Sequence, residues 1–446
     1  MWDLGASFSR LYICKMYKNL KTLFKADASG MFKGMLTLLV GAGLARLLGL
    51  ISIPILARVY EPEDFGVLAL YNAFVFVLVP VMSLRYVQAI PLPRTDVMAF
   101  NLVAVCLKLI FISSLIMVGV LLVWGEEVFV FFDVQSLLPW WWLVVVGASG
   151  AALYEVFSLW ATRKKQYKVI AKTQVYQSLL GNLIKIGLGL LDFKSVGLIL
   201  GQIVSQSAGI TSLTKKAGGV RVLCSKVEYK KELLIVRYYK GFFWFRLPSQ
   251  ILMVLSIQAP VMMMAALYGK EITGQLSLAM LALALPVGLV GNAMAKAYYA
   301  EIAEIGKRNI NKIKELTLAV QRRLFFVGAP VFVVIYFCSE FLFRVLFGEE
   351  WGTAGLFASL LAPFILFQLT SSPLMEVVNV LGIQAFYLVL HGVRVFGLFL
   401  VFMAVRHYSI GAESFVAILS FYLSFFYLLA SVLVVLILFR VSNKVE

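Results

Sequence analysis

The sequence predicts an all-α polytopic membrane protein with about twelve transmembrane helices in two six-helix bundles. Hydrophobic residues make up 61% of the 446 residues, charged residues make up only 14%, and the mean hydropathy is +0.91. Apolar stretches of about 20 residues, the length that crosses a bilayer as a helix, recur along almost the whole chain. The loops between them alternate between strongly basic and nearly free of Lys and Arg, which is the pattern of a chain that crosses repeatedly.

The first 34 residues are basic, and we expect no cleavable signal peptide among them, because the first long apolar stretch begins only near Met35. Within them, ASFSRLYICKMYKNLKTLFK places apolar residues at helical spacing with Lys and Arg between them. This pattern predicts a cytoplasmic amphipathic helix that lies on anionic membrane lipids. A disordered basic tail is the alternative.

Twelve apolar segments follow. They are 35–57, 65–90, 98–124, 139–162, 170–191, 195–213, 241–267, 274–298, 317–347, 354–378, 383–405 and 414–439.

The distribution of basic residues predicts the orientation of these segments. The termini and the loops on their side hold 25 Lys and Arg residues, whereas the loops on the other side hold four. Basic loops stay in the cytoplasm, so both termini are predicted to be cytoplasmic. The same bias explains the net charge of +17 without binding to nucleic acid.

The longest loop divides the segments six and six. The predicted parts are an N-terminal bundle (35–213), a cytoplasmic linker (214–240), a C-terminal bundle (241–440) and a tail (441–446). The halves resemble each other weakly: YEPEDFG (60–66) matches YGKEITG (268–274) at three positions, and the pairs Pro54/Pro80 and Pro260/Pro286 are both 26 residues apart. Six segments per repeat imply parallel repeats about an axis along the membrane normal. Pro54 and Pro260 are the candidate hinges, since proline interrupts a helix.

Charged residues inside the segments are the candidate functional residues. Eleven Lys and Arg lie there with only three acids, Glu155, Glu340 and Glu376. Four cations lie more than two turns from either end of their segment: Arg46, Lys108, Lys185 and Arg394. Each costs at least about 2.5–3.5 kcal/mol at that depth, and the sequence offers no acid at comparable depth to pair with them. We therefore expect them to line a cationic, water-filled central cavity whose counter-ion is the cargo, with a structural ion pair or a hydrogen-bonded core position as the alternative for each.

Further polar residues are expected at the edge of this cavity. Arg85 and Arg246 lie about one turn inside the cytoplasmic ends of their segments and are predicted to contact the cargo, with Glu155 and Glu376 in supporting positions. Asn182 belongs to a group of amides whose other members are Gln174, Gln177, Gln202 and Gln206. Hydrogen bonding between helices is the leading explanation for these amides.

The sequence contains no signature of an enzyme, a metal site or a cofactor site. It has no Walker A motif, no cysteine pair with metal-ligand spacing, and no outer loop long enough to hold an active site. A polysaccharide polymerase or a membrane glycosyltransferase is therefore a weaker alternative than a transporter.

Four stretches together resemble a known family. They are YEPEDFGVLALY, LRYVQAI, LWATRKKQYKVIAKTQVYQS and FGEEWGTAG. They are similar to polysaccharide transporters, the Wzx-type flippases of the MOP superfamily that export O-antigen or exopolysaccharide repeat units. The resemblance runs from about residue 35 to 440. It implies a MATE-like pair of bundles, a position in the bacterial inner membrane, undecaprenyl-diphosphate-linked glycan as cargo, and the polysaccharide polymerase and chain-length proteins as partners. Arg46 and Arg85 match positions where family members carry cavity cations.

One position departs from the family pattern. Members often carry a glutamate after an Arg-Tyr pair, whereas Arg85 and Tyr86 are followed here by Val87 and Gln88. This predicts an Arg85 that is freer to contact the cargo, with Gln88 in support. The competing function is a small-molecule exporter of the multidrug type, but a cavity for cationic drugs should contain buried acids rather than cations.

Overall fold

A computed structural model describes residues 29–216, 229–306, 309–381 and 383–442, and every regular element among these residues is a helix. The predicted amphipathic segment before residue 29, the middle of the linker and the last four residues lie outside the described parts.

The α-helices are α2 (Ser29–Val59), α3 (Pro62–Met82), α4 (Asp96–Phe131), α5 (Trp142–Arg163), α6 (Tyr167–Leu190), α7 (Lys194–Ser207), α8 (Ile210–Lys216), α10 (Tyr229–Tyr238), α11 (Leu247–Pro286), α12 (Asn292–Ile305), α13 (Ile310–Phe347), α14 (Gly352–Ser371), α15 (Glu376–Leu381), α16 (Gln384–His407) and α17 (Ala412–Ser442). Short 3-10 segments are Tyr86–Ala89, Gln135–Trp140, Glu349–Trp351 and Ser372–Met375, and π-helical turns are Phe242–Arg246 and Val287–Gly291.

Ten helical segments of the described chain are long and apolar enough to cross a membrane. The difference from the twelve predicted segments has two sources. The helix α6 carries too many polar residues to be counted by composition, although its length of 24 residues suffices. The helix α11 is counted once, yet its backbone is not helical at Gly269 (φ 79°, ψ −179°), which separates it into two helices. A left-handed backbone of this kind is open to glycine and strained for other residues.

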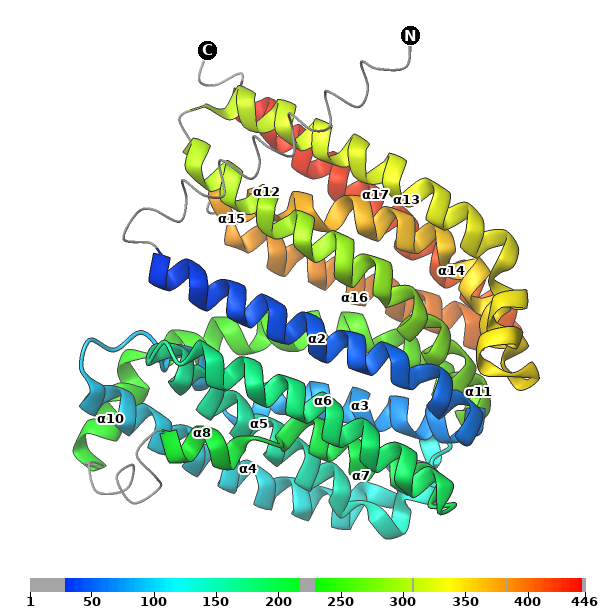
Figure 1. The fold of residues 1–446 in the computed structure, drawn as a ribbon, viewed down its shortest axis with the longest axis horizontal. Coiled ribbons are helices and arrows are strands. Elements are labelled where there is room, and N and C mark those ends of the chain that lie inside the picture. Colours follow the sequence, from blue (N-terminus) through cyan, green and yellow to red (C-terminus); the bar gives the residue numbers. More distant parts are fainter. Residues whose placement is uncertain (1–28, 217–228, 307–308, 382, 443–446) are drawn as a thin grey trace.

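The helices form two groups that lie side by side. In Figure 1, α12 to α17 occupy the upper half, α3 to α10 occupy the lower half, and α2 runs between them. The lower group has its own apolar core, which includes Tyr71, Phe129 and Trp160. The upper group has a smaller one around Ile302 and Leu374. A third core contains residues of both groups, so the two halves are joined through it.

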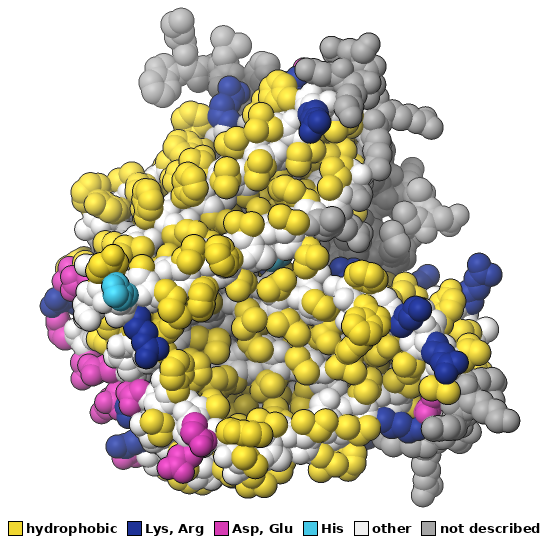
Figure 2. Space-filling view, turned by 180° about the vertical axis from the view of Figure 1, so that it is seen from behind, with side chains coloured by type: hydrophobic (Ala, Val, Ile, Leu, Met, Phe, Trp, Pro, Cys, Tyr) yellow, Lys and Arg dark blue, Asp and Glu magenta, His cyan; other side chains and the backbone are white. Residues whose placement is uncertain are grey.

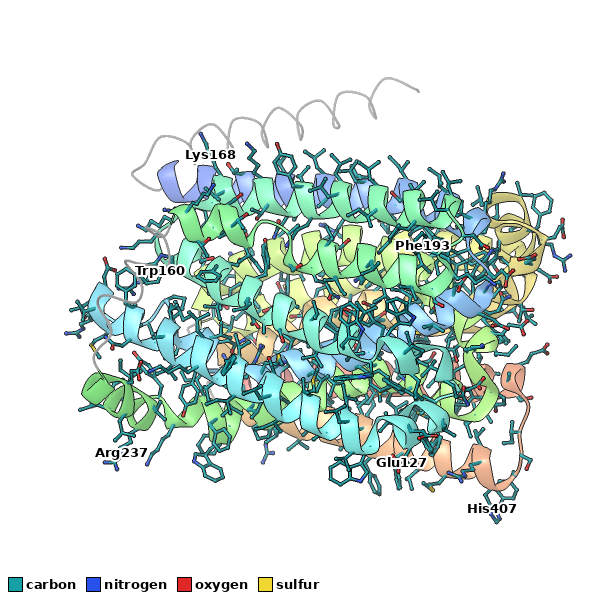
Figure 3. All side chains as sticks on the ribbon, turned by 90° about the horizontal axis from the view of Figure 1, so that it is seen from below. Glu127, Trp160, Lys168, Phe193, Arg237 and His407 are labelled. Atoms are coloured by element: carbon teal, nitrogen blue, oxygen red, sulfur yellow. The ribbon has the colours of Figure 1, made fainter. Side chains whose placement is uncertain are left out.

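The two ends of the molecule differ in charge. Figure 3 places Lys168 and Arg237 at one end and Glu127, Phe193 and His407 at the other, as the predicted alternation of loops requires. We call the first the basic end and the second the acidic end. In Figure 2 most of the acidic side chains gather at the left edge, with some basic ones among them, and a broad apolar belt separates them from a group of basic side chains at the right. Such a belt is what a bilayer would cover.

The halves meet at the acidic end through two glycines from the matching sequences. A Cβ atom on Gly66 would lie 1.8 Å from the carbonyl oxygen of Lys270, and a Cβ atom on Gly274 would lie 1.7 Å from the carbonyl oxygen of Pro62. Positions 62 and 66 correspond to 270 and 274 in the sequence match, so the contact is reciprocal. The two-fold axis that the sequence predicts between the repeats would produce such a reciprocal contact, and no side chain larger than hydrogen fits at either glycine.

The linker differs from its prediction. We expected a loop over 214–240, but α8 continues to Lys216 and Tyr229–Tyr238 forms α10, which packs against α4. The reason is amphipathicity: Ile235 and Tyr239 are buried against the core of the N-terminal half, while the charged residues Arg237 and Lys240 are exposed.

Candidate functional site

Two adjoining hollows meet at Arg46, and the larger of them lies between the two halves. The larger has a volume of about 520 Å³ and is lined by residues of both halves, with Asn72, Asn182, Lys185, Gln202 and Gly288 beside Arg46. The second, of about 420 Å³, is lined by Arg46, Gln174, Gln177, Ser178 and Asn182 among others. No aspartate or glutamate lines either hollow. Most of the larger hollow's lining is apolar, and the polar part of the two linings consists of cations, amides and hydroxyls, which suits an anionic and hydroxyl-rich ligand.

Arg46 reaches across the interface from α2. Its Nη1 donates a hydrogen bond to the carbonyl oxygen of Gly288 at 3.1 Å. Gly288 lies in the π-helical turn Val287–Gly291, and single π-turns within helices are frequent at functional sites. Arg46 forms no ion pair with any carboxylate of the described chain, so most of its five N–H groups remain for a ligand.

Lys185 is the second cation of the larger hollow. It is buried on α6, and its Nζ donates to Oε1 of Gln202 on α7 at 2.6 Å. Gly201 makes room for it, because a Cβ atom there would lie 2.4 Å from Cγ of Lys185. The ammonium group of Lys185 is therefore hydrogen-bonded to a neutral amide and not to a carboxylate.

Amides on neighbouring helices complete the polar lining. Nε2 of Gln206 donates to Oδ1 of Asn72 at 3.3 Å, so the predicted hydrogen bonding between helices occurs here. Ser178 donates to the carbonyl oxygen of Ala45 at 2.7 Å. Sequence reasoning missed Asn72, although it is an amide within an otherwise apolar segment and could have been found by that signal.

Toward the acidic end the larger hollow ends on Leu56 and Phe65, which belong to the core shared by the two halves. Contacts between the halves continue beyond them. Nε1 of Trp351 donates to the carbonyl oxygen of Ala57 at 2.8 Å, and Lys270 pairs with Glu63 at 3.0 Å. The halves are therefore packed together on this side of Arg46.

A separate hollow of about 570 Å³ nearer the basic end is lined by Gln88, Glu155 and Arg246 among others, and Arg85 lies beside it without lining it. Nη1 of Arg85 pairs with Oε1 of Glu155 at 3.0 Å. The expectation that Arg85 is freer without the family glutamate is wrong, because α5 supplies Glu155 instead. A left-handed backbone at Leu84 and Arg85 ends α3 and turns the side chain toward that carboxylate.

Lys108 does not line the hollows at Arg46. Its Nζ pairs with Oε2 of Glu232 at 2.7 Å, and their side chains are 56% and 7% exposed. Our expectation that no acid reaches its depth is wrong, because α10 folds back along α4 and brings a carboxylate that the sequence assigns to the linker.

Arg394 also lies apart from Arg46, within the C-terminal half. It is buried on α16, where Nη1 donates to the hydroxyl of Tyr427 at 3.2 Å. Its guanidinium lies 5.6 Å and 5.4 Å from the ring centroids of Phe426 and Tyr427, within the range of a cation–π interaction. The structure thus places it in an aromatic core position, the alternative that the sequence left open.

The remaining predicted residues have simpler surroundings. Glu376 begins α15 at the basic end, and Pro54 and Pro260 lie inside α2 and α11, where each removes one helical hydrogen bond. Of the twelve predicted site residues, Arg46, Lys185 and Asn182 are brought together in one hollow. The described residues contain no group of three His, Cys, Asp or Glu side chains that could hold a metal ion.

Comparison with known proteins gives a family and a fold. A family described as "Polysaccharide biosynthesis protein" matches residues 55–355. The chain is similar in structure to an inward-facing multidrug resistance MATE family transporter of the MOP superfamily, with a TM-score of 0.70, 14% identity, and coverage of 89% of this chain and 95% of that one. It is also similar to the lipid II flippase MurJ in an inward closed conformation, with a TM-score of 0.65, 14% identity, and coverage of 92% and 93%. A search of curated proteins finds no match.

Proposed function

The chain belongs to the polysaccharide biosynthesis protein family and has the fold of MOP-superfamily transporters, and on this premise we propose that it is a flippase for lipid-linked glycan. Its cargo is undecaprenyl-diphosphate-linked oligosaccharide, an O-antigen or exopolysaccharide repeat unit, exported across the bacterial inner membrane. The observation that carries the proposal is the acid-free lining around Arg46 and Lys185.

Each part of such a cargo has a matching environment. The planar guanidinium of Arg46 can donate two parallel hydrogen bonds to a diphosphate, and Lys185 adds a second positive charge. Asn72, Asn182 and Gln202 supply amide groups for sugar hydroxyls. The polyprenyl tail can remain in the bilayer between the two halves.

Alternating access gives the transport cycle. The packed contacts at the acidic end correspond to a cavity that is closed toward the outside, if the basic end faces the cytoplasm as the positive-inside rule predicts. Movement of one half against the other would open that end, with Pro54 and Pro260 as the flexible points of α2 and α11. The membrane potential assists, since moving one negative charge out of a cell that is negative inside gains about 2.3 kcal/mol per 100 mV.

Export of small cationic molecules is the competing function. A similarity of 14% identity to a multidrug transporter supports the fold but not the substrate. The lining of the two hollows at Arg46 has no carboxylate to attract a cation. An anionic cargo therefore accounts for the site better.

The test is surface glycan per molecule of membrane protein in cells that carry Arg46→Ala or Arg46→Lys. A charge-assisted hydrogen bond contributes about 1.5–3 kcal/mol, so Arg46→Ala should lower export roughly 10- to 150-fold. Arg46→Lys keeps the charge but loses the planar fork, and should retain partial export. Arg323→Ala, which removes a cation that lines neither hollow at Arg46, is the control and should export normally.

Normal export per molecule in Arg46→Ala would refute the role of the cavity. Normal surface glycan in cells without the protein, together with greater sensitivity to cationic drugs, would establish the multidrug function instead.

A further inference from the structure

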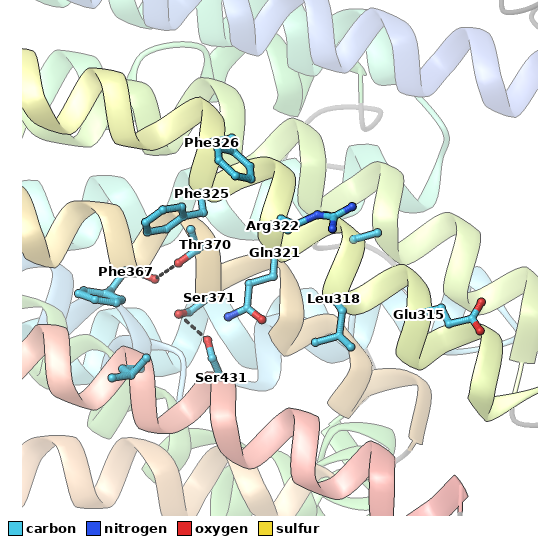
Figure 4. Close-up of a pocket in the computed structure, with 12 residues that line it drawn as sticks. Glu315, Leu318, Gln321, Arg322, Phe325, Phe326, Phe367, Thr370, Ser371 and Ser431 are labelled. Carbon is cyan, nitrogen blue, oxygen red and sulfur yellow. Dashed lines mark hydrogen bonds between the residues drawn. The ribbon is translucent and has the colours of Figure 1, made fainter.

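A groove of about 800 Å³ lies on the C-terminal half, away from Arg46. Its lining comes only from α13, α14 and α17. Figure 4 shows Phe325, Phe326 and Phe367 toward one end of the groove and Glu315 at the other, with Gln321 and Arg322 between them. The volume is within the range of roughly 300–1,000 Å³ that is usual for ligand sites.

The charges of α13 place this groove relative to the bilayer. After Arg322 and Arg323 the helix has no charged residue until Glu340, an interval of about 24 Å at 1.5 Å per residue. The two arginines therefore mark the edge of the hydrocarbon layer at the basic end. Glu315 lies two turns, about 10 Å, further out, in the region of the lipid headgroups. The polar end of the groove is at headgroup level and its aromatic end is in the hydrocarbon.

The groove holds one cation and one anion that are not paired. Glu315 and Arg322 both line it, seven residues apart on one face of α13. Neither side chain forms an ion pair with any residue in the described parts of the chain, and they do not pair with each other. The hydroxyls of Ser371 and Ser431 are satisfied within the protein, because Ser431 donates to Ser371 at 2.7 Å and Ser371 donates to the carbonyl oxygen of Tyr427 at 3.0 Å.

The aromatic part of the groove is open to the surroundings. Phe325 and Phe326 are 46% and 69% exposed and Leu318 is 42% exposed. Inside a membrane these side chains would contact acyl chains. Helical side chains point toward the N-terminus of their helix, so Arg322 points from the hydrocarbon edge toward the headgroups and Glu315 (Figure 4).

We propose that this groove binds a phospholipid with a zwitterionic headgroup that ends in a primary amine. Arg322 contacts the phosphate, Glu315 accepts hydrogen bonds from the ammonium group, and one acyl chain lies along Phe325, Phe326 and Phe367. Charge complementarity selects this lipid. An anionic headgroup or a lipid-linked diphosphate would leave Glu315 beside a second negative charge, and a quaternary ammonium has no N–H group to donate to it.

The experiment measures lipid binding to the full chain in detergent. Delipidated protein is mixed with phosphatidylethanolamine, phosphatidylcholine or phosphatidylglycerol, and bound lipid is counted by native mass spectrometry. We expect phosphatidylethanolamine to bind about tenfold more tightly than either of the others. Glu315→Gln should abolish its advantage over phosphatidylcholine, and Arg322→Gln should weaken binding of both zwitterionic lipids.

Two matched variants control for the loss of charge alone. Arg323→Gln removes the neighbouring cation, and Glu301→Gln removes an exposed acid of α12; neither residue lines the groove, so neither change should alter binding. Preference for phosphatidylglycerol, or an equal loss in Arg323→Gln and Arg322→Gln, would overturn the proposal. The assay contains no glycan cargo, so its failure is distinct from failure of the flippase function.

Discussion

Arg85 and Glu155 show how a single residue can be misjudged from the sequence. The absence of a glutamate beside Arg85 in the chain suggested a free cation, yet an acid 70 residues away pairs with it at 3.0 Å. The side chain of Arg85 is 8% exposed and that of Glu155 is 27% exposed. Because the guanidinium of Arg85 is buried, the pair is held more by the penalty of leaving that charge without a partner than by its net strength.

Removing one partner of this pair should therefore destabilise the protein. Glu155→Gln should lower the stability by roughly 3 kcal/mol, because the charge of Arg85 then lacks a counter-charge. The double variant Arg85→Gln with Glu155→Gln should recover part of the loss. The measurement is the thermal unfolding midpoint in detergent, followed by size-exclusion chromatography. A double variant less stable than Glu155→Gln would contradict this account.

At the scale of elements, the pair of Lys108 and Glu232 fastens α10 to α4. We expect Glu232→Gln to loosen α10, because the buried carboxylate provides the polar anchor of that short helix. Hydrogen exchange of residues 229–238 should then accelerate about tenfold or more, as the loss of a charge-assisted hydrogen bond of about 1.5–3 kcal/mol predicts. Glu315→Gln serves as the control and should leave the exchange of residues 229–238 unchanged. An unchanged exchange rate in Glu232→Gln itself would show that apolar packing alone holds α10 on α4.

For the whole molecule, the reciprocal contact of Gly66 and Gly274 determines how closely the halves approach at the acidic end. Gly66→Ala places a methyl group where the carbonyl oxygen of Lys270 lies, so it should favour states in which this end is open. Residues 63 and 270 form an ion pair in the protein. Cysteines introduced at these two positions report the closed state by cross-linking. The cross-linking yield should fall at least fivefold in Gly66→Ala and stay unchanged in Gly43→Ala, where an added Cβ contacts nothing within 4 Å.

The orientation of the whole molecule is a second prediction at this scale. Reporter fusions after Lys165 and Lys231 should be active in the cytoplasm, and fusions after Glu127 and Glu349 should be active in the periplasm, because the basic loops remain inside. A periplasmic signal from the fusion after Lys231 would contradict both the orientation and the division of the chain at the linker.

The sequence by itself determined the class of protein, the approximate positions of the membrane segments and the end of the molecule at which each loop lies. These properties depend on local hydropathy and charge, because each segment inserts into the bilayer according to its own apolar length and its own flanking charges. It also singled out Arg46 and Lys185 by their depth and Asn182 as an amide in an apolar segment, because a polar group in hydrocarbon is costly wherever its partner lies.

Only the tertiary structure decided which cations are free. Glu232 reaches Lys108 because α10 folds onto α4, Glu155 reaches Arg85 from α5, and two aromatic rings of α17 lie against Arg394. Each pairing depends on which face a helix turns toward its neighbours and on residues distant in the chain. The depth of a residue along its segment does not reveal how the helix is rotated about its own axis. The charge of a cavity can therefore be known only once the packing of the helices is known.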